Sequence, residues 1–114
     1  MTVKEVYEAC GGGYEEMIAK FHDEKIIASF LKMFLRDQSF GQFVEKLEAN
    51  DAKGAFEAAH NLKGMVLNLN LVSMMAPVYA VTEDLRRGDI AAAKEHFPEL
   101  EQSYIASKSA ISNL

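Results

Sequence analysis

The fold is decided by residues 52–69, which read AKGAFEAAHNLKGMVLNL. Apolar residues recur within them at alternating steps of four and three: Ala55, Ala59, Leu62, Val66 and Leu69. At 3.6 residues per turn this spacing forms one stripe along a helix, which predicts a helix packed against other helices. Asp51 is a suitable N-cap for this helix, and Asn70 can end it in the left-handed conformation.

Three residues of this helix lie off the apolar stripe and close to one another: His60, Lys63 and Gly64. His60 follows a stripe residue and is turned about 100° away from it, and residues three and four positions further on are its surface neighbours. A largely neutral imidazole at pH 7 has one ring nitrogen free to act as a nucleophile. Lys63 can neutralise an anion there. Gly64 leaves room for another molecule, at a cost of about 1 kcal/mol in helix propensity relative to Ala.

Two further residues are expected to contact a partner around this site. Lys53 lies two turns before His60 on the same side and adds positive potential. Leu67 is apolar on the same face and suits a hydrophobic contact.

The rest of the chain predicts helices and no strand. Thr2 and Glu5 have the spacing of a capping box. The glycines at 11–13 read as a flexible turn, since no Gly-Lys-Ser/Thr follows to make a phosphate loop. We expect further helices over 3–9, 14–21, 24–49, 74–87 and 90–113. Together they predict one all-α domain over 1–114, with a cap segment of one or two short helices at 1–22 and an antiparallel up-down four-helix bundle at 24–113.

Some details of these helices stay open or rest on single residues. The apolar phase slips at residues 37–38, so residues 24–49 form either one bent helix or two helices that meet at a Ser39 cap. Pro77 is expected in the first turn of its helix, where a missing N–H costs least. Asp89 caps the last helix, and Pro98 is expected to kink it.

Composition and charge argue against nucleic-acid binding, secretion and a membrane span. The chain has 12 Lys and Arg against 17 Asp and Glu, a net charge of −5, which disfavours nonspecific nucleic-acid binding. Cys10 is the only cysteine and the start lacks an apolar signal region, so we expect a cytoplasmic protein. The uncharged stretch at 65–82 contains two Asn and a Pro, which favours buried helix packing over a membrane span.

The remaining histidines, two acidic residues and three methionines are expected to have no functional role. His22 and His96 have no Cys or His partners at metal-ligand spacing and read as surface residues. Glu83 and Asp84 read as part of a solvated face. The three methionines that read as core gap-fillers are Met33, Met74 and Met75.

The chain resembles the histidine-containing phosphotransfer family of two-component phosphorelays. The resemblance rests on Ala58-Ala59-His60-Asn61-Leu62-Lys63-Gly64, then Asn68-Leu69, then Arg87-Gly88-Asp89, and it covers the chain from about Phe34 to the C-terminus. This chain has Met65 where many relatives have Ser or Ala. It also has Asn70 where Gly is usual, and Asn is the next best residue for a left-handed helix end.

The resemblance implies that His60 carries a phosphoryl group between receiver-domain aspartates, with Lys63 stabilising its charge and Gly64 giving access. The partners implied are receiver domains of response regulators or hybrid histidine kinases. Mg²⁺ is expected on the receiver, and the chain itself is expected to need no cofactor or metal. We expect a monomer with no kinase activity of its own, because nothing in the sequence resembles a nucleotide site.

Three other interpretations remain open from the sequence. The first is a helical adaptor that binds a partner without phosphoryl chemistry. The second is a plain surface histidine, the commonest role of a lone helical His. The third, a ferritin-like metal bundle, needs two inward Glu-x-x-His pairs, whereas the chain has one, Glu57-x-x-His60, that is expected to face outward. The cognate receiver, the pathway and the direction of phosphate flow are not encoded in these patterns.

Overall fold

The protein is all-helical, as predicted. The computed structural model describes all 114 residues and contains no strand. None of its helices combines the length and the apolar character that crossing a membrane requires. The seven helices are α1 (Val3–Ala9), α2 (Tyr14–Phe21), α3 (Glu24–Arg36), α4 (Ser39–Glu48), α5 (Ala52–Leu69), α6 (Val72–Arg86) and α7 (Ile90–Ser112).

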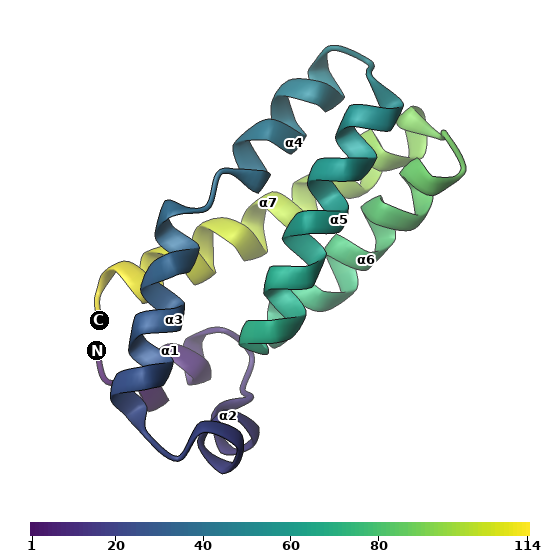
Figure 1. Cartoon of the computed structure of the whole chain (residues 1–114). Coiled ribbons are helices and arrows are strands. Elements are labelled where there is room, and N and C mark those ends of the chain that lie inside the picture. The colour runs from purple at the N-terminus through teal and green to yellow at the C-terminus, as the bar shows by residue number, and fades with distance from the viewer.

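The helices form an elongated body of 41 × 21 × 19 Å. Helices α4, α5, α6 and α7 run side by side along it, each packed against the next (Figure 1). Helix α3 packs on the C-terminal part of α7, and the short α1 and α2 gather at the same end of the body. The two termini lie next to each other there, where the Met1 ammonium group donates a hydrogen bond to the Asn113 carbonyl.

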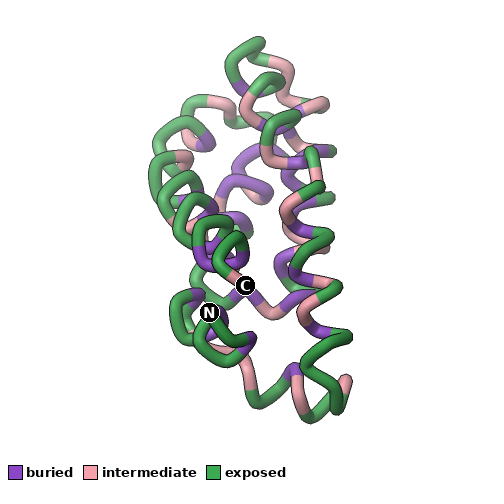
Figure 2. The backbone as a smooth tube through the Cα atoms, turned by 90° about the vertical axis from the view of Figure 1, so that its left-hand side faces the viewer, coloured by how far each residue is buried: buried purple, intermediate pink, exposed green.

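Helix α5 has the bounds that its apolar pattern and caps predict. The Asp51 carboxylate accepts a hydrogen bond from the Gly54 N–H at 2.9 Å, and Asn70 ends the helix at a φ of 57°. All five residues of the predicted stripe are buried, and His60 is exposed. Buried positions face inward along the helices, with exposed positions on the outer surface (Figure 2). The helical phase of α5 therefore points His60 at solvent, with Lys63 and Gly64 partly exposed beside it.

Residues 24–49 form two helices. One of the two alternatives placed Ser39 as the N-cap of the second helix, and this detail is wrong. Ser39 is the first residue of α4, and its N–H donates to the Asp37 carboxylate at 2.8 Å. The break comes where the apolar phase slips, because Phe34 and Phe43 can both face the core only if the helix is interrupted between them.

The turn between α5 and α6 is shorter than expected. Helix α6 begins at Val72, two residues before the predicted start, so Pro77 lies in its second turn and not its first. Leu71, at the N-cap position, is buried and provides no side-chain cap, so no capping residue marks the start of α6 in the sequence. The predicted start of α7 is confirmed: the Asp89 carboxylate accepts from the Ala92 N–H. The helix continues through Pro98.

The triple-glycine loop anchors the N-terminal segment on this turn. Gly11 and Gly13 have φ values of 93° and 103°, which only glycine adopts without strain. A Cβ on Gly13 would lie 2.7 Å from the Asn70 side-chain nitrogen, and that nitrogen donates to the Gly13 carbonyl at 3.1 Å. The Ser73 N–H donates to the Cys10 carbonyl at 2.9 Å. These contacts place α2 beside the C-terminal end of α5.

Candidate functional site

The centre of the site is His60, which lies midway along α5 with its ring exposed. Its imidazole stacks on the ring of Phe56, one turn earlier on the same helix, with ring centroids 5.8 Å apart and an interplanar angle of 18°. The ring of His60 differs in this from that of His96 on α7, which hydrogen-bonds to another side chain. The His60 ring is thus contacted through its face, and its nitrogens remain open to another molecule.

Lys63 is the cation nearest to His60 along the helix surface. It is partly buried, and its ammonium group lies 5.2 Å from the centroid of the Tyr79 ring on α6. Tyr79 is itself 57% exposed. A cation over an exposed ring is held by about 0.5–1 kcal/mol, so the ammonium group can leave the ring for a stronger anionic partner.

Gly64 gives the site open space, as predicted. A Cβ built on it would have no heavy atom within 4 Å outside its own helix backbone. Residue 64 lies one turn from His60, so the surface beside the imidazole is unobstructed.

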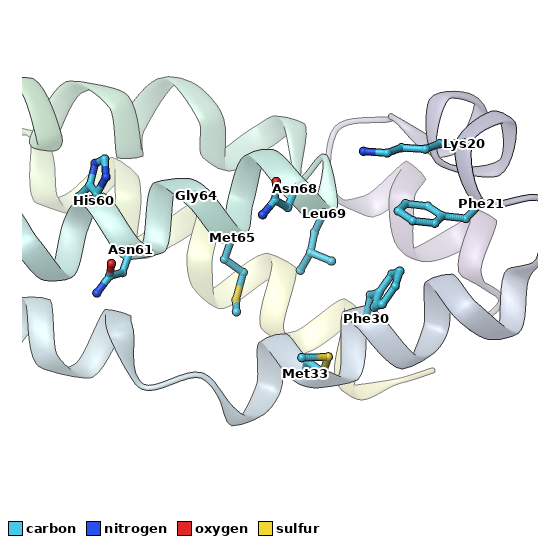
Figure 3. A pocket seen from close by; sticks show the side chains of 10 residues that line it. All are labelled: Lys20, Phe21, Phe30, Met33, His60, Asn61, Gly64, Met65, Asn68 and Leu69. Atoms are coloured by element: carbon cyan, nitrogen blue, oxygen red, sulfur yellow. The ribbon is translucent and has the colours of Figure 1, made fainter.

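A groove beside His60 links α5 to α2 and α3 (Figure 3). It has a volume of about 580 Å³, and Phe30 and Met33 reach it from α3 while Lys20 and Phe21 reach it from α2. Phe21 and Phe30 meet edge to face at a centroid distance of 5.1 Å. The expectation that Met33 fills the core is wrong, because its side chain is 53% exposed in this groove. The groove is therefore an apolar surface with a histidine at one end.

The two predicted partner contacts lie apart from this groove. Lys53 lines a separate hollow between α5 and α6, together with Phe56 and the arginines Arg86 and Arg87. Leu67 is exposed on α5, one turn beyond Lys63. Arg86 joins the hollow to the His60 surface, since its guanidinium carbon lies 5.0 Å from the centroid of the Phe56 ring.

A second polar cluster lies on the α6–α7 side, where a solvated face was expected. Asp84 is only 4% exposed, so that expectation is wrong for it. Its carboxylate accepts from the Arg87 guanidinium at 2.9 Å and contacts the Nδ1 atom of His96 at 2.6 Å. The hydrogen bond to Asp84 and the charge of that carboxylate raise the pKa of His96. This cluster ties α6 to α7 and lies outside the groove that His60 lines.

The raised pKa of His96 predicts a pH-dependent stability. A histidine in an unfolded chain has a pKa of about 6.5. Because the pKa is higher in the folded protein, the stabilisation is fully present below about pH 6.5 and is lost as the pH rises through the raised pKa of His96. We expect the free energy of unfolding of His96→Gln to lack this decrease with rising pH, as measured by urea unfolding between about pH 5.5 and 8.5. His22→Gln is the control, and an unchanged pH slope in His96→Gln would contradict the assignment.

Sequence reasoning missed three side chains around His60: Phe56, Tyr79 and Arg86. Phe56 could have been found, because residues i and i+4 of a helix are surface neighbours. Tyr79 and Arg86 come from α6, and no local pattern in the sequence places them beside α5. No cluster of three or more His, Cys, Asp or Glu side chains is arranged to hold a metal ion.

Comparisons of this chain with protein-family models, with curated proteins and with solved structures found no match.

Proposed function

We propose that this protein is a histidine phosphotransfer domain in which His60 relays a phosphoryl group between receiver-domain aspartates. The observation that carries the proposal is the exposed imidazole of His60 on the face of a long helix, beside the open space at Gly64. In this proposal α5, α6, α7 and the α3–α4 pair form an antiparallel four-helix bundle that holds the imidazole on its surface. The protein acts in the cytoplasm as a phosphocarrier, with no kinase activity of its own.

The transfer step uses groups that this surface offers. An imidazole nitrogen of His60 attacks the phosphorus of an aspartyl phosphate. A P–N bond forms, the P–O bond breaks, and the aspartate carboxylate leaves with the bonding electron pair. Lys63 lies one turn away and moves from the Tyr79 ring to the phosphoryl oxygens, where its charge compensates theirs. The receiver supplies Mg²⁺ and the remaining charge stabilisation.

The surroundings of His60 suit a receiver domain as the partner. Lys53 and Lys63 place positive charge along the α5–α6 side, although the whole chain has a net charge of −5. The neighbouring Arg86 and Arg87 are paired with Glu83 and Asp84 and add little net charge there. A receiver's phosphorylation site is acidic, so the charges are complementary. The apolar groove on the α2–α3 side offers area for a hydrophobic contact, and Leu67 and Lys53 are proposed as outer contacts of the same partner.

The direct test is transfer from a phosphorylated receiver domain that carries radiolabelled phosphate. We expect this protein to gain label that is lost in acid and retained in alkali, the behaviour of a phosphohistidine. A receiver that binds stoichiometrically without passing on label would instead support the helical adaptor. Receivers captured from the source organism serve as donors.

Lys63→Ala is expected to slow transfer by about tenfold or more. A hydrogen bond to a charged group contributes about 1.5–3 kcal/mol, and 1.36 kcal/mol is a factor of ten in rate. Binding of an unphosphorylated receiver should change much less, since the phosphoryl charge is absent from it. Rapid-mixing transfer kinetics beside a binding isotherm separate the two effects.

Lys53→Ala is the matched comparison for this prediction. Lys53 is exposed and two turns from His60, so its loss should weaken receiver docking without a selective effect on transfer. Equal losses of binding and transfer in Lys63→Ala would show that Lys63 is only a docking charge.

A further inference from the structure

Three planar side chains are in contact along the exposed edge of α5 and α6. The guanidinium group of Arg86 lies over the ring of Phe56, and this ring stacks nearly parallel to the imidazole of His60. Arg86 is also held by Glu83, whose carboxylate accepts from its Nε atom at 2.8 Å. The contacts therefore run from an ion pair on α6 to the imidazole on α5.

This arrangement matters because the imidazole has little else to fix its direction. An exposed histidine ring is free about a broad χ2 torsion, and a hydrogen bond from one ring nitrogen is the common means of restraining it. His96 has such a restraint in Asp84, whereas the ring contact of His60 is the face of Phe56. Stacking on Phe56 limits the plane of the imidazole, because the two rings are nearly parallel at an interplanar angle of 18°. The lone pairs of the ring nitrogens lie in that plane and are therefore not directed at the Phe56 ring.

We infer that Phe56 is a positioning residue for phosphoryl transfer, which holds the His60 imidazole in line with the docked donor, and that Arg86 holds Phe56 in place. The inference rests on the proposed function. In-line attack needs an aligned nucleophile, and a misplacement of about 1 Å can cost two orders of magnitude in rate. Phe56 itself touches no reacting atom, so its effect is exerted through the direction of the ring.

The test compares Phe56→Leu, which removes the aromatic face but keeps an apolar side chain, with Phe56→Tyr, which keeps the face. The first readout is the NMR shifts of the His60 ring protons. A stacked aromatic ring shifts them upfield, so in Phe56→Leu they should move to the values of the exposed His22, and in Phe56→Tyr they should stay. Unmoved shifts in Phe56→Leu would overturn the stack.

The second readout compares two phosphoryl donors. With a phosphorylated receiver, whose geometry is fixed by docking, Phe56→Leu should transfer about tenfold or more slowly, and Phe56→Tyr at nearly the normal rate. With phosphoramidate, the phosphoryl group passes to the imidazole as ammonia leaves with the electron pair of the broken P–N bond. This small donor approaches from any side, so all variants should react alike. With the receiver as donor, the transfer rate of Arg86→Gln should lie between those of the wild type and Phe56→Leu.

The outcomes separate this inference from the proposed function. If the wild-type protein gains no label from the receiver, the proposed function fails and the positioning role fails with it. If wild type and Phe56→Leu transfer equally fast from the receiver, only the positioning role fails. If Phe56→Leu reacts more slowly with phosphoramidate as well, Phe56 affects the nucleophilicity of the ring, and positioning is again excluded. Melting curves confirm that each variant is folded.

Discussion

His60→Gln is expected to gain no label from a phosphorylated receiver while its helical signal and melting behaviour stay close to those of the wild type. Glutamine has no nucleophilic ring nitrogen, so no P–N bond can form. The side chain is exposed, and exposed substitutions shift stability by about 0.5 kcal/mol or less. The measurements are label stoichiometry and thermal unfolding by circular dichroism.

The chain provides its own controls for this experiment, because it has two other histidines. His22→Gln and His96→Gln should both accept label to the wild-type level, since neither ring lines the groove beside Gly64. Full labelling of His60→Gln would show that another residue is the acceptor. Unfolding of His60→Gln would show that the ring is needed for packing, contrary to its exposed position.

Much of the fold could be predicted because its signals are local. The bounds of α5 follow from Asp51, Asn70 and an unbroken apolar stripe, and all of these act within a turn or two of the chain. The same holds for α1, where the predicted capping box is present in both directions between Thr2 and Glu5. The exposure of His60 follows equally directly, since one step along a helix turns a residue about 100° from the buried stripe.

The errors occurred where contacts between distant segments decide the outcome. The early start of α6 follows a turn that is held by Gly13 and Cys10, about sixty residues earlier in the chain. Asp84 seemed solvated because its partner His96 lies on the next helix. Met33 seemed a core residue, yet α3 turns it into the groove that α5 and α2 complete. Helical periodicity carries no information about such neighbours.

Gly64→Leu is expected to leave the protein at least as stable and to reduce phosphotransfer by about two orders of magnitude. Leucine favours a helix over glycine by up to about 1 kcal/mol, and a Cβ at position 64 meets open space. The same side chain stands one turn from His60, where a receiver must close on the imidazole, and a displacement of about 1 Å there is enough for a hundredfold loss.

Gly41→Leu is the matched control, because Gly41 is also a helical glycine whose Cβ would have nothing within 4 Å. It lies on α4, outside the groove that His60 lines. We expect the two variants to melt at equal or higher temperatures than the wild type, with transfer impaired only in Gly64→Leu. An early melt confined to Gly64→Leu would mean that residue 64 packs against a neighbouring helix. Normal transfer by Gly64→Leu would mean that the partner reaches His60 over another face. A loss of transfer at 64 that is absent at 41 therefore separates steric access to the imidazole from any general effect of adding a side chain to a helix.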